Sequence, residues 1–230
     1  MLENYYKTLE SNPLFSQLDD YSLDELLGCL RPKVKTYEKN EIIALAGEPF
    51  TNLGIVLEGQ VHVLKESATG AKLIMSTLEP GEMFGEMIAF SGRSKWAATV
   101  QATKKSVVLF MESDTIVGQC NRMCSWHKTL IQNMLKIVSN RALYLNQKVE
   151  YLSIKSMRGK LAKFFVEESE HKSSLKFELN INRNEMADFL NVSRPSMSRE
   201  MGKMKEEGLI DYKRNQVEIL DLETLEVLAE

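Results

Sequence analysis

A run of basic and hydroxyl residues near the C-terminus has the spacing of a surface that can read a nucleic acid. Within it, three methionines recur at steps of four and three, so they share one face of a helix: Met197, Met201 and Met204. At about 100° per residue, Arg199 lies almost opposite that apolar face. An exposed helical arginine can donate two hydrogen bonds to a guanine edge in the major groove of DNA. The spacing therefore predicts a helix that packs through its methionines and reads DNA through Arg199.

The segment before this helix predicts a second, shorter helix and a tight turn. Asn182 and Glu185 have the spacing of a capping box, in which each side chain binds a backbone amide at the start of a helix. Asn191 follows the apolar stripe of this helix, and asparagine tolerates the left-handed backbone of a sharp reversal. Two helices and a turn also describe an ordinary helical hairpin with a solvated polar face, and that alternative stays open on these residues alone.

The residues after Gly208 make the pattern more specific. They read as two short strands around Arg214 and Asn215, a β-hairpin or wing directly after the second helix. With the wing, the segment resembles the recognition motif of the Crp/Fnr family of bacterial transcription regulators. The matching residues are Arg183, Glu185, Met186, Ala187, Ser193, Arg194 and Arg199.

The resemblance implies a homodimer that binds a palindromic operator in double-stranded DNA and, if it is an activator, contacts RNA polymerase. It implies that Arg194 and Arg199 read bases. Further DNA contacts are expected from Ser193, Ser196, Lys203 and, in the wing, Arg214. Pro195 stands where the best-known members have a glutamate that accepts from cytosine, so the half-site should differ from theirs.

Length, charge and cysteine content indicate a cytoplasmic protein of one or two domains. The chain has 230 residues and a formal net charge of -3, so any DNA-binding surface must be a local basic face. No apolar run reaches membrane-spanning length, and the N-terminus lacks the order of a signal peptide. Three cysteines, an odd number, favour a reducing compartment over a disulfide framework.

The first half of the chain predicts helices followed by a small β-barrel. Residues up to about 30 look helical, and Ser22 with Glu25 has the spacing of a helix start. From Val34, short β-rich pieces alternate with glycine turns, which is typical of an antiparallel barrel or sandwich. The order of the glycines resembles the cyclic-nucleotide-binding barrel of the Crp/Fnr family. The predicted fold class is α+β: a jelly-roll barrel, a long dimerisation helix and a winged helix-turn-helix.

A long helix is expected from about Ser125 to Leu152. Apolar residues alternate steps of four and three along it, which is a coiled-coil seam: Ile131, Leu135, Val138, Ala142, Leu145, Val149 and Leu152. A second stripe of Leu130, Met134 and Ile137 can pack on the helix's own barrel. A helix that is apolar on two sides must bury both, so we predict a dimer, although both stripes could belong to an intramolecular core. The predicted domains are 1–124 (effector-sensing barrel), 125–154 (dimerisation helix and hinge) and 155–230 (DNA binding).

The effector pocket is expected from the same resemblance. In cyclic-AMP-binding members a short helix begins Gly-Glu-hydrophobic, and an Arg-Ser pair follows about ten residues later. Gly85, Glu86 and Met87 match the first half, but Trp96 and Ala97 stand where the pair belongs. Tryptophan cannot neutralise a phosphate, so the effector is predicted to be an unidentified small molecule other than cyclic AMP, or the pocket to be filled by Trp96. The resemblance also places Tyr144, Leu145 and Asn146 beside this pocket.

Other sensing chemistries remain as alternatives. Arg93 and Ser94 could supply the missing pair if the loop shifted by three residues, and the protein would then bind a cyclic nucleotide. Cys120, Cys124 and His127 share a helix face and could bind a metal or sense oxidation, although small half-buried residues at a helix start explain them better. Cys29 alone near the N-terminus argues against an iron–sulfur cluster, and His62 is a weak candidate for a haem ligand. We expect neither haem nor a metal site.

An enzymatic function is not indicated. The three histidines, His62, His127 and His171, are far apart and form no metal-binding cluster of the cupin type. The sequence contains no phosphate-binding loop, nucleophile elbow or dinucleotide fingerprint, so no catalytic residues are assigned. A cyclic-nucleotide-binding accessory subunit without DNA binding is a third class, and the wing argues against it.

Overall fold

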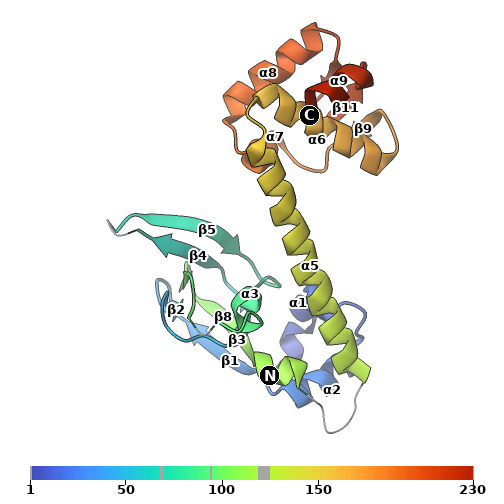
Figure 1. The fold of residues 1–230 in the computed structure, drawn as a ribbon. Coiled ribbons are helices and arrows are strands. Elements are labelled where there is room, and N and C mark those ends of the chain that lie inside the picture. Colours follow the sequence, from blue (N-terminus) through green and yellow to red (C-terminus); the bar gives the residue numbers. More distant parts are fainter. Residues whose placement is uncertain (1, 68–69, 94, 119–124, 230) are drawn as a thin grey trace. The chain divides into compact units, whose positions relative to one another are not determined.

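The computed structural model describes residues 2–67, 70–93, 95–118 and 125–229. The chain divides into two compact units, Met1–Asn140 and Arg141–Glu230, and each is described by itself (Figure 1). In the part of the chain that the structure describes, no helix is both long and apolar enough to cross a lipid bilayer.

The first unit is built on two antiparallel sheets, which confirms the predicted barrel (Figure 1). One sheet has the order β1-β8-β3-β6 and the other β2-β7-β4-β5 among the described residues. The strands are β1 (Lys33–Tyr37), β2 (Ile42–Ala44), β3 (Asn52–Glu58), β4 (Val61–Glu66), β5 (Lys72–Leu78), β6 (Met83–Phe84), β7 (Thr99–Ala102) and β8 (Ser106–Glu112). Alternate residues of these strands point inward and form an apolar core that includes Val56, Phe84, Val100 and Phe110, together with Trp96 from the segment before β7.

Helices before and after the strands pack on the outer side of β3 and β8 and form a second core in this unit. They are η1 (Glu3–Tyr5), α1 (Tyr6–Glu10), η2 (Pro13–Phe15), α2 (Asp20–Leu30), α4 (Ser113–Val117) and the first part of α5 (Ser125–Ser153), whereas the short helix α3 (Glu86–Ala89) lies between β6 and β7 along the chain. The predicted intramolecular stripe of α5 is confirmed, because Leu130 and Met134 are buried here with Leu26, Ile55 and Leu109.

The start predicted for the helix at Ser22 is wrong. Helix α2 begins at Asp20, and its N-cap is Asp19, whose carboxylate accepts from the Ser22 amide at 2.9 Å and from the Ser22 hydroxyl. A carboxylate at the N-cap accepts from amides and also favours the positive end of the helix dipole. The serine is therefore a donor inside the first turn.

The second unit is a winged helix-turn-helix, as predicted. It contains the end of α5 and α6 (Met157–Lys172), β9 (Lys176–Glu178), α7 (Arg183–Leu190), α8 (Arg194–Glu206), β10 (Ile210–Lys213), β11 (Gln216–Ile219) and α9 (Leu222–Ala229). Strands β10 and β11 pair as the hairpin of the wing, and β9 joins β11 on the other side.

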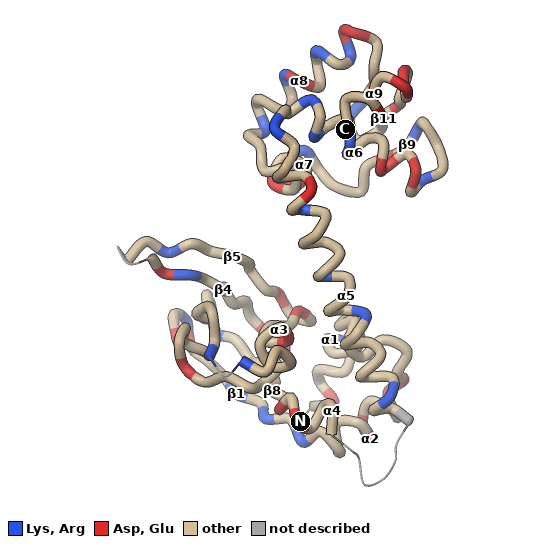
Figure 2. The backbone as a smooth tube through the Cα atoms, viewed as in Figure 1, with Lys and Arg blue, Asp and Glu red and all other residues tan. Residues whose placement is uncertain are grey.

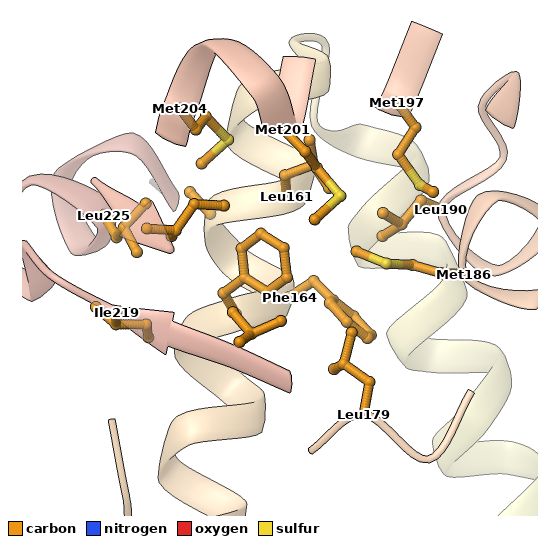
Figure 3. Packing of buried hydrophobic residues seen from close by; sticks show 14 of the residues in the cluster. Leu161, Phe164, Leu179, Met186, Leu190, Met197, Met201, Met204, Ile219 and Leu225 are labelled. Carbon is orange, nitrogen blue, oxygen red and sulfur yellow. The ribbon is translucent and has the colours of Figure 1, made fainter. Parts of the chain in front are cut away.

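The core of this unit contains many methionines (Figure 3). Met197, Met201 and Met204 point from α8 toward Leu161 and Phe164 of α6 and toward Leu190 of α7, and each methionine is at most 1% exposed. The face predicted to pack is therefore the face that packs. Its burial leaves the opposite side of α8, with Arg199, in solvent.

Candidate DNA interface and effector pocket

The N-terminal turn of α8 carries a chain of hydrogen bonds. Ser193 is the N-cap, and its Oγ accepts from the Ser196 amide at 3.3 Å and donates to Ser196 Oγ at 2.8 Å. Arg199 Nη2 in turn donates to Ser196 Oγ at 3.2 Å. Ser193 thus caps the helix, and Ser196 holds the Arg199 guanidinium along the exposed side of the first turns.

The turn between α7 and α8 has the predicted local chemistry. Asn182 and Glu185 form the capping box, and Asn191 is left-handed at φ 53°. Two ammonium groups satisfy the carbonyl end of α7: Lys160 Nζ donates to the Leu190 carbonyl at 3.1 Å and Lys148 Nζ to the Asp188 carbonyl at 3.0 Å. Cations at a helix C-terminus also complement its dipole. The end of α7 is therefore held both by its own turn and by lysines of α5 and α6.

An ion-pair network joins α8 to α6. Arg158 Nε donates to Glu200 at 2.7 Å, and the two terminal nitrogens of Arg158 donate to the Glu207 oxygens at 2.7 and 2.8 Å. These partners hold the pKa of Arg158 above its ordinary value, and Arg158 holds the pKa of Glu207 below its own. Such a forked pair fixes orientation as well as distance. Lys203 lies 3.9 Å from the other oxygen of Glu200, on the solvent side.

The residues predicted to contact DNA lie on α8 and at the wing turn. Arg194, Arg199 and Lys203 are exposed on α8, and Arg194 Nη1 donates to Asn184 Oδ1 at 3.1 Å. Arg214 is exposed at the turn of the wing, with a left-handed φ of 55°. Figure 2 shows blue and red residues mixed over this unit, so the basic surface of α8 is local.

Sequence reasoning missed the contacts of Arg183. The family motif includes this residue, but the sequence predicts no contact for it. Its half-buried guanidinium donates to the Arg214 carbonyl and contacts Met201 of α8. The contact joins residues 31 positions apart, so no local sequence spacing predicts it.

In the first unit, the predicted effector residues around α3 differ in exposure. Gly85 has φ 95°, and a Cβ there would lie 2.5 Å from the Asn52 carbonyl oxygen, so this position requires glycine. The Glu86 side chain is buried at 1% exposure, whereas Met87 is 56% exposed. Glu86 therefore places a carboxyl group in the interior of this unit.

Trp96 lies inside the barrel in a group of aromatic rings. Its ring centroid is 5.0 Å from that of Phe50 and 6.4 Å from that of Phe84, and Phe84 is 6.3 Å from Phe110. Trp96 is 8% exposed, and its indole Nε1 finds no acceptor within the described residues. Ala97 is exposed, and so is Arg93, whereas Ser94 lies outside the described residues. The Arg93-Ser94 alternative therefore stays a prediction.

The predicted dimer seam is largely exposed in the single chain. Leu135, Leu145, Val149 and Leu152 are 62%, 54%, 64% and 54% exposed. Val138 and Ala142 are also exposed, and Ile131 is half-buried. Tyr144 and Asn146, predicted beside the effector, are exposed too. Exposed rows of large apolar side chains are typical of interaction surfaces in proteins.

The thiol and metal alternative involves Cys120, Cys124 and His127. Cys120 and Cys124 lie outside the described residues. His127 is buried, and its Nε2 lies 3.3 Å from the Thr115 carbonyl oxygen. Among the residues that the structure describes, no three histidine, cysteine, aspartate or glutamate side chains are grouped as metal ligands would be.

Comparison with known proteins assigns both halves of the chain. The family model of the cyclic nucleotide-binding domain matches residues 34–122, and that of the Crp-like helix-turn-helix domain matches residues 159–228. An anaerobic regulatory protein of Pasteurella multocida is 22% identical over 214 residues, which cover 90% of this chain and 76% of that protein. The cyclic AMP receptor protein of Thermus thermophilus is 22% identical over 221 residues, which cover 96% of this chain and 98% of that protein.

A solved structure gives the same fold. The crystal structure of the catabolite activator protein of Thermus thermophilus matches with a TM-score of 0.54 and 22% identity, over 95% of this chain and 98% of that one. Together, the barrel, the winged helix-turn-helix and the two matching domain models show that the chain belongs to the Crp/Fnr family of transcription regulators.

Proposed function

We propose that this regulator is a cytoplasmic homodimer, without catalytic activity, that binds a palindromic operator through α8 of each subunit. The observation that carries the proposal is the two-sided character of α8. Its methionine face is buried, and its opposite face presents Arg199, held by the Ser193–Ser196 hydrogen bonds. A helix of this kind fits the major groove of B-DNA, and two-fold symmetry places the half-sites about 34 Å apart. A regulator that activates would also contact RNA polymerase.

In this proposal Arg194 and Arg199 read base edges. Ser193, Ser196 and Lys203 contact phosphates or base edges, and Arg214 contacts the backbone from the wing. Arg194 follows the N-cap directly, so it reaches the groove from the tip of α8. Pro195 has no group that accepts from cytosine, and the preferred half-site is correspondingly different from one read by glutamate.

The test of base reading is the Arg199→Ala variant. Operator sequences are selected from a random duplex library with the wild-type protein, and competition binding then compares each base-pair change. We expect Arg199→Ala to lose about 1–3 kcal/mol of discrimination at one base pair. The control is Lys172→Ala, which removes an exposed charge from α6 in the same unit. Unchanged affinity and selectivity in Arg199→Ala would show that α8 is not the reading helix.

The dimer is proposed from the exposed seam of α5. A matched pair of variants tests it, because Leu143 and Leu145 are 65% and 54% exposed on the same helix and only Leu145 lies in the seam. Leu145→Asp would place an unpaired charge in each half of the interface, and the desolvation penalty should dissociate or unfold the dimer. Leu143→Asp should remain dimeric. Light scattering that gives the same mass for both variants would point to a different interface.

The effector is proposed to be a small molecule other than cyclic AMP that binds in the barrel. Support comes from the buried Glu86 carboxylate and from Trp96 at the position where a phosphate-binding arginine is expected. A cyclic nucleotide phosphate would be desolvated near a carboxylate with little compensation. The ring group of Phe50, Phe84 and Trp96 favours an apolar or aromatic effector, and the Trp96 indole N–H would donate to an acceptor on it.

A further inference from the structure

We propose that Arg183 is a positioning residue that sets the wing against the recognition helix and so places Arg214 for its DNA contact. This inference rests on the proposed DNA-binding function. Arg183 is the first residue of α7, and its guanidinium touches three other elements of the same unit. Nη2 donates to the Arg214 carbonyl at 3.0 Å, and Nη1 lies 3.1 Å from Met201 Sδ.

The aromatic contact of Arg183 adds a second anchor on the wing. Its guanidinium carbon lies 5.2 Å from the centre of the Tyr212 ring, in strand β10. A planar guanidinium can stack on a ring while its edge donates hydrogen bonds in fixed directions. An ammonium group has no such plane, so lysine cannot make the ring contact and both edge contacts together. The chemistry at this position is specific to arginine.

The wing turn needs support from outside the hairpin. Lys213 and Gln216 are paired residues, so Arg214 and Asn215 alone form the turn. Arg214 has φ 55°, a conformation that a residue with a Cβ adopts at an energetic cost. Both turn carbonyls are hydrogen-bonded from outside, since the Leu179 amide donates to the Asn215 carbonyl at 2.9 Å and Arg183 donates to that of Arg214. The backbone of Arg214 is thereby fixed while its side chain stays exposed.

The Arg183 guanidinium is directed into the protein. Burial lowers the pKa of Arg183, although an arginine remains protonated at neutral pH. Its described partners are a carbonyl oxygen, the thioethers of Met186 and Met201, and an aromatic ring. Because the guanidinium binds these protein groups, Arg183 affects DNA binding through the position of Arg214.

The experiment is a double-mutant cycle on full-length protein, read out as operator affinity against salt concentration. The variants are Arg183→Gln, Arg214→Ala and the double variant, with Arg183→Lys as a charge-preserving partner. We expect Arg214→Ala and Arg183→Gln each to weaken binding by about fivefold or more and to reduce the salt slope by about 0.9, the value for one phosphate. The double variant should lose no more than either single variant, because both remove the same contact.

The lysine variant separates positioning from direct contact. If Arg183 acts as a fork, Arg183→Lys should behave like Arg183→Gln, whereas a residue that itself binds phosphate would be largely replaced by lysine. Additive losses, or an unaffected Arg183→Lys or Arg214→Ala variant, would overturn the proposal. Wild-type protein that binds no operator would instead refute the DNA-binding function. Thermal melting shows whether each variant is folded. If Arg183→Gln melts at a lower temperature than wild type, Arg183→Lys takes its place in the double-mutant cycle.

Discussion

The hydroxyl of Tyr151, in α5, donates to Glu167 Oε2, in α6, across 2.6 Å. Tyr151 is 1% exposed, and Gln147 Nε2 donates to the same oxygen at 2.9 Å. Burial and the neighbouring carboxylate raise the pKa of Tyr151, so the phenol stays protonated at neutral pH and donates. This hydrogen bond fastens the end of α5 to the DNA-binding unit.

Tyr151→Phe should lower the free energy of unfolding by about 1–3 kcal/mol, because a hydrogen bond to a charged group is lost at a buried site. Urea denaturation monitored by circular dichroism measures this difference. Tyr144→Phe is the matched control, since Tyr144 is 49% exposed on the same helix. Equal stability of the two variants would contradict a structural role for the Tyr151 hydroxyl.

Acid should weaken the anchoring of α8 through the Arg158–Glu207 pair. The hydrogen bonds from Arg158 lower the pKa of Glu207 below its ordinary value of 4.5. A carboxylate with a lowered folded-state pKa stabilises the protein above its unfolded-state pKa, and that stability is lost as the pH falls through the folded-state value.

The comparison of wild type with Glu207→Gln tests this pH dependence. The variant should melt at a lower temperature than wild type near neutral pH, and the difference should shrink as the pH falls below about 4.5. Glu206→Gln, which changes the preceding exposed residue, is the control. A constant difference in melting temperature across this range would exclude ionisation of Glu207 as its source.

Two glycine substitutions should change stability in opposite directions. At Gly85 an alanine would meet the Asn52 carbonyl and adopt φ 95°, so we expect a loss of about 1–3 kcal/mol. At Gly28, in helix α2, a Cβ has no atom within 4 Å, so alanine should stabilise by about 0.5–1 kcal/mol. Chemical denaturation measures the change in the free energy of unfolding for each variant. An increase for Gly85→Ala would contradict the described backbone.

Cyclic AMP at physiological concentration should neither release measurable heat in calorimetry nor change operator affinity. Trp96 lies in the barrel, so its fluorescence should respond to a true effector. A ligand shifts the DNA-binding equilibrium only by its different affinities for the two states of the protein. Micromolar binding of cyclic AMP that disappears in Arg93→Ala would show that the Arg93-Ser94 pair supplies the phosphate site after all.

Local chemistry was predictable from the sequence, and long-range contacts were not. The Asn182–Glu185 capping box and the Asn191 turn depend on neighbours within a few residues, and both are present in the structure. The Ser22 prediction failed because Asp19, three residues earlier, is also a capping residue, and spacing alone does not rank two candidates.

The contacts that assemble the candidate site join distant segments. Arg183 with Arg214, Arg158 with Glu207, and Trp96 with Phe50 are brought together only by the fold, so periodicity carries no signal for them. The resemblance of the glycine pattern predicted the barrel, which the structure confirms. The same resemblance predicts no ligand, because it places Trp96 where cyclic-AMP-binding members have an arginine.

Phe189, in α7, packs against the end of α5. The Phe189 ring, in α7, lies 5.0 Å from Tyr151 and 6.0 Å from Tyr144, and Lys148 stands over its face at 5.2 Å. Because Tyr151 also donates a hydrogen bond to Glu167, this stretch of α5 contacts both α6 and α7. We therefore expect this stretch of α5 to move together with α6 and α7, so that a rotation of the helix at these residues is passed to the helix-turn-helix.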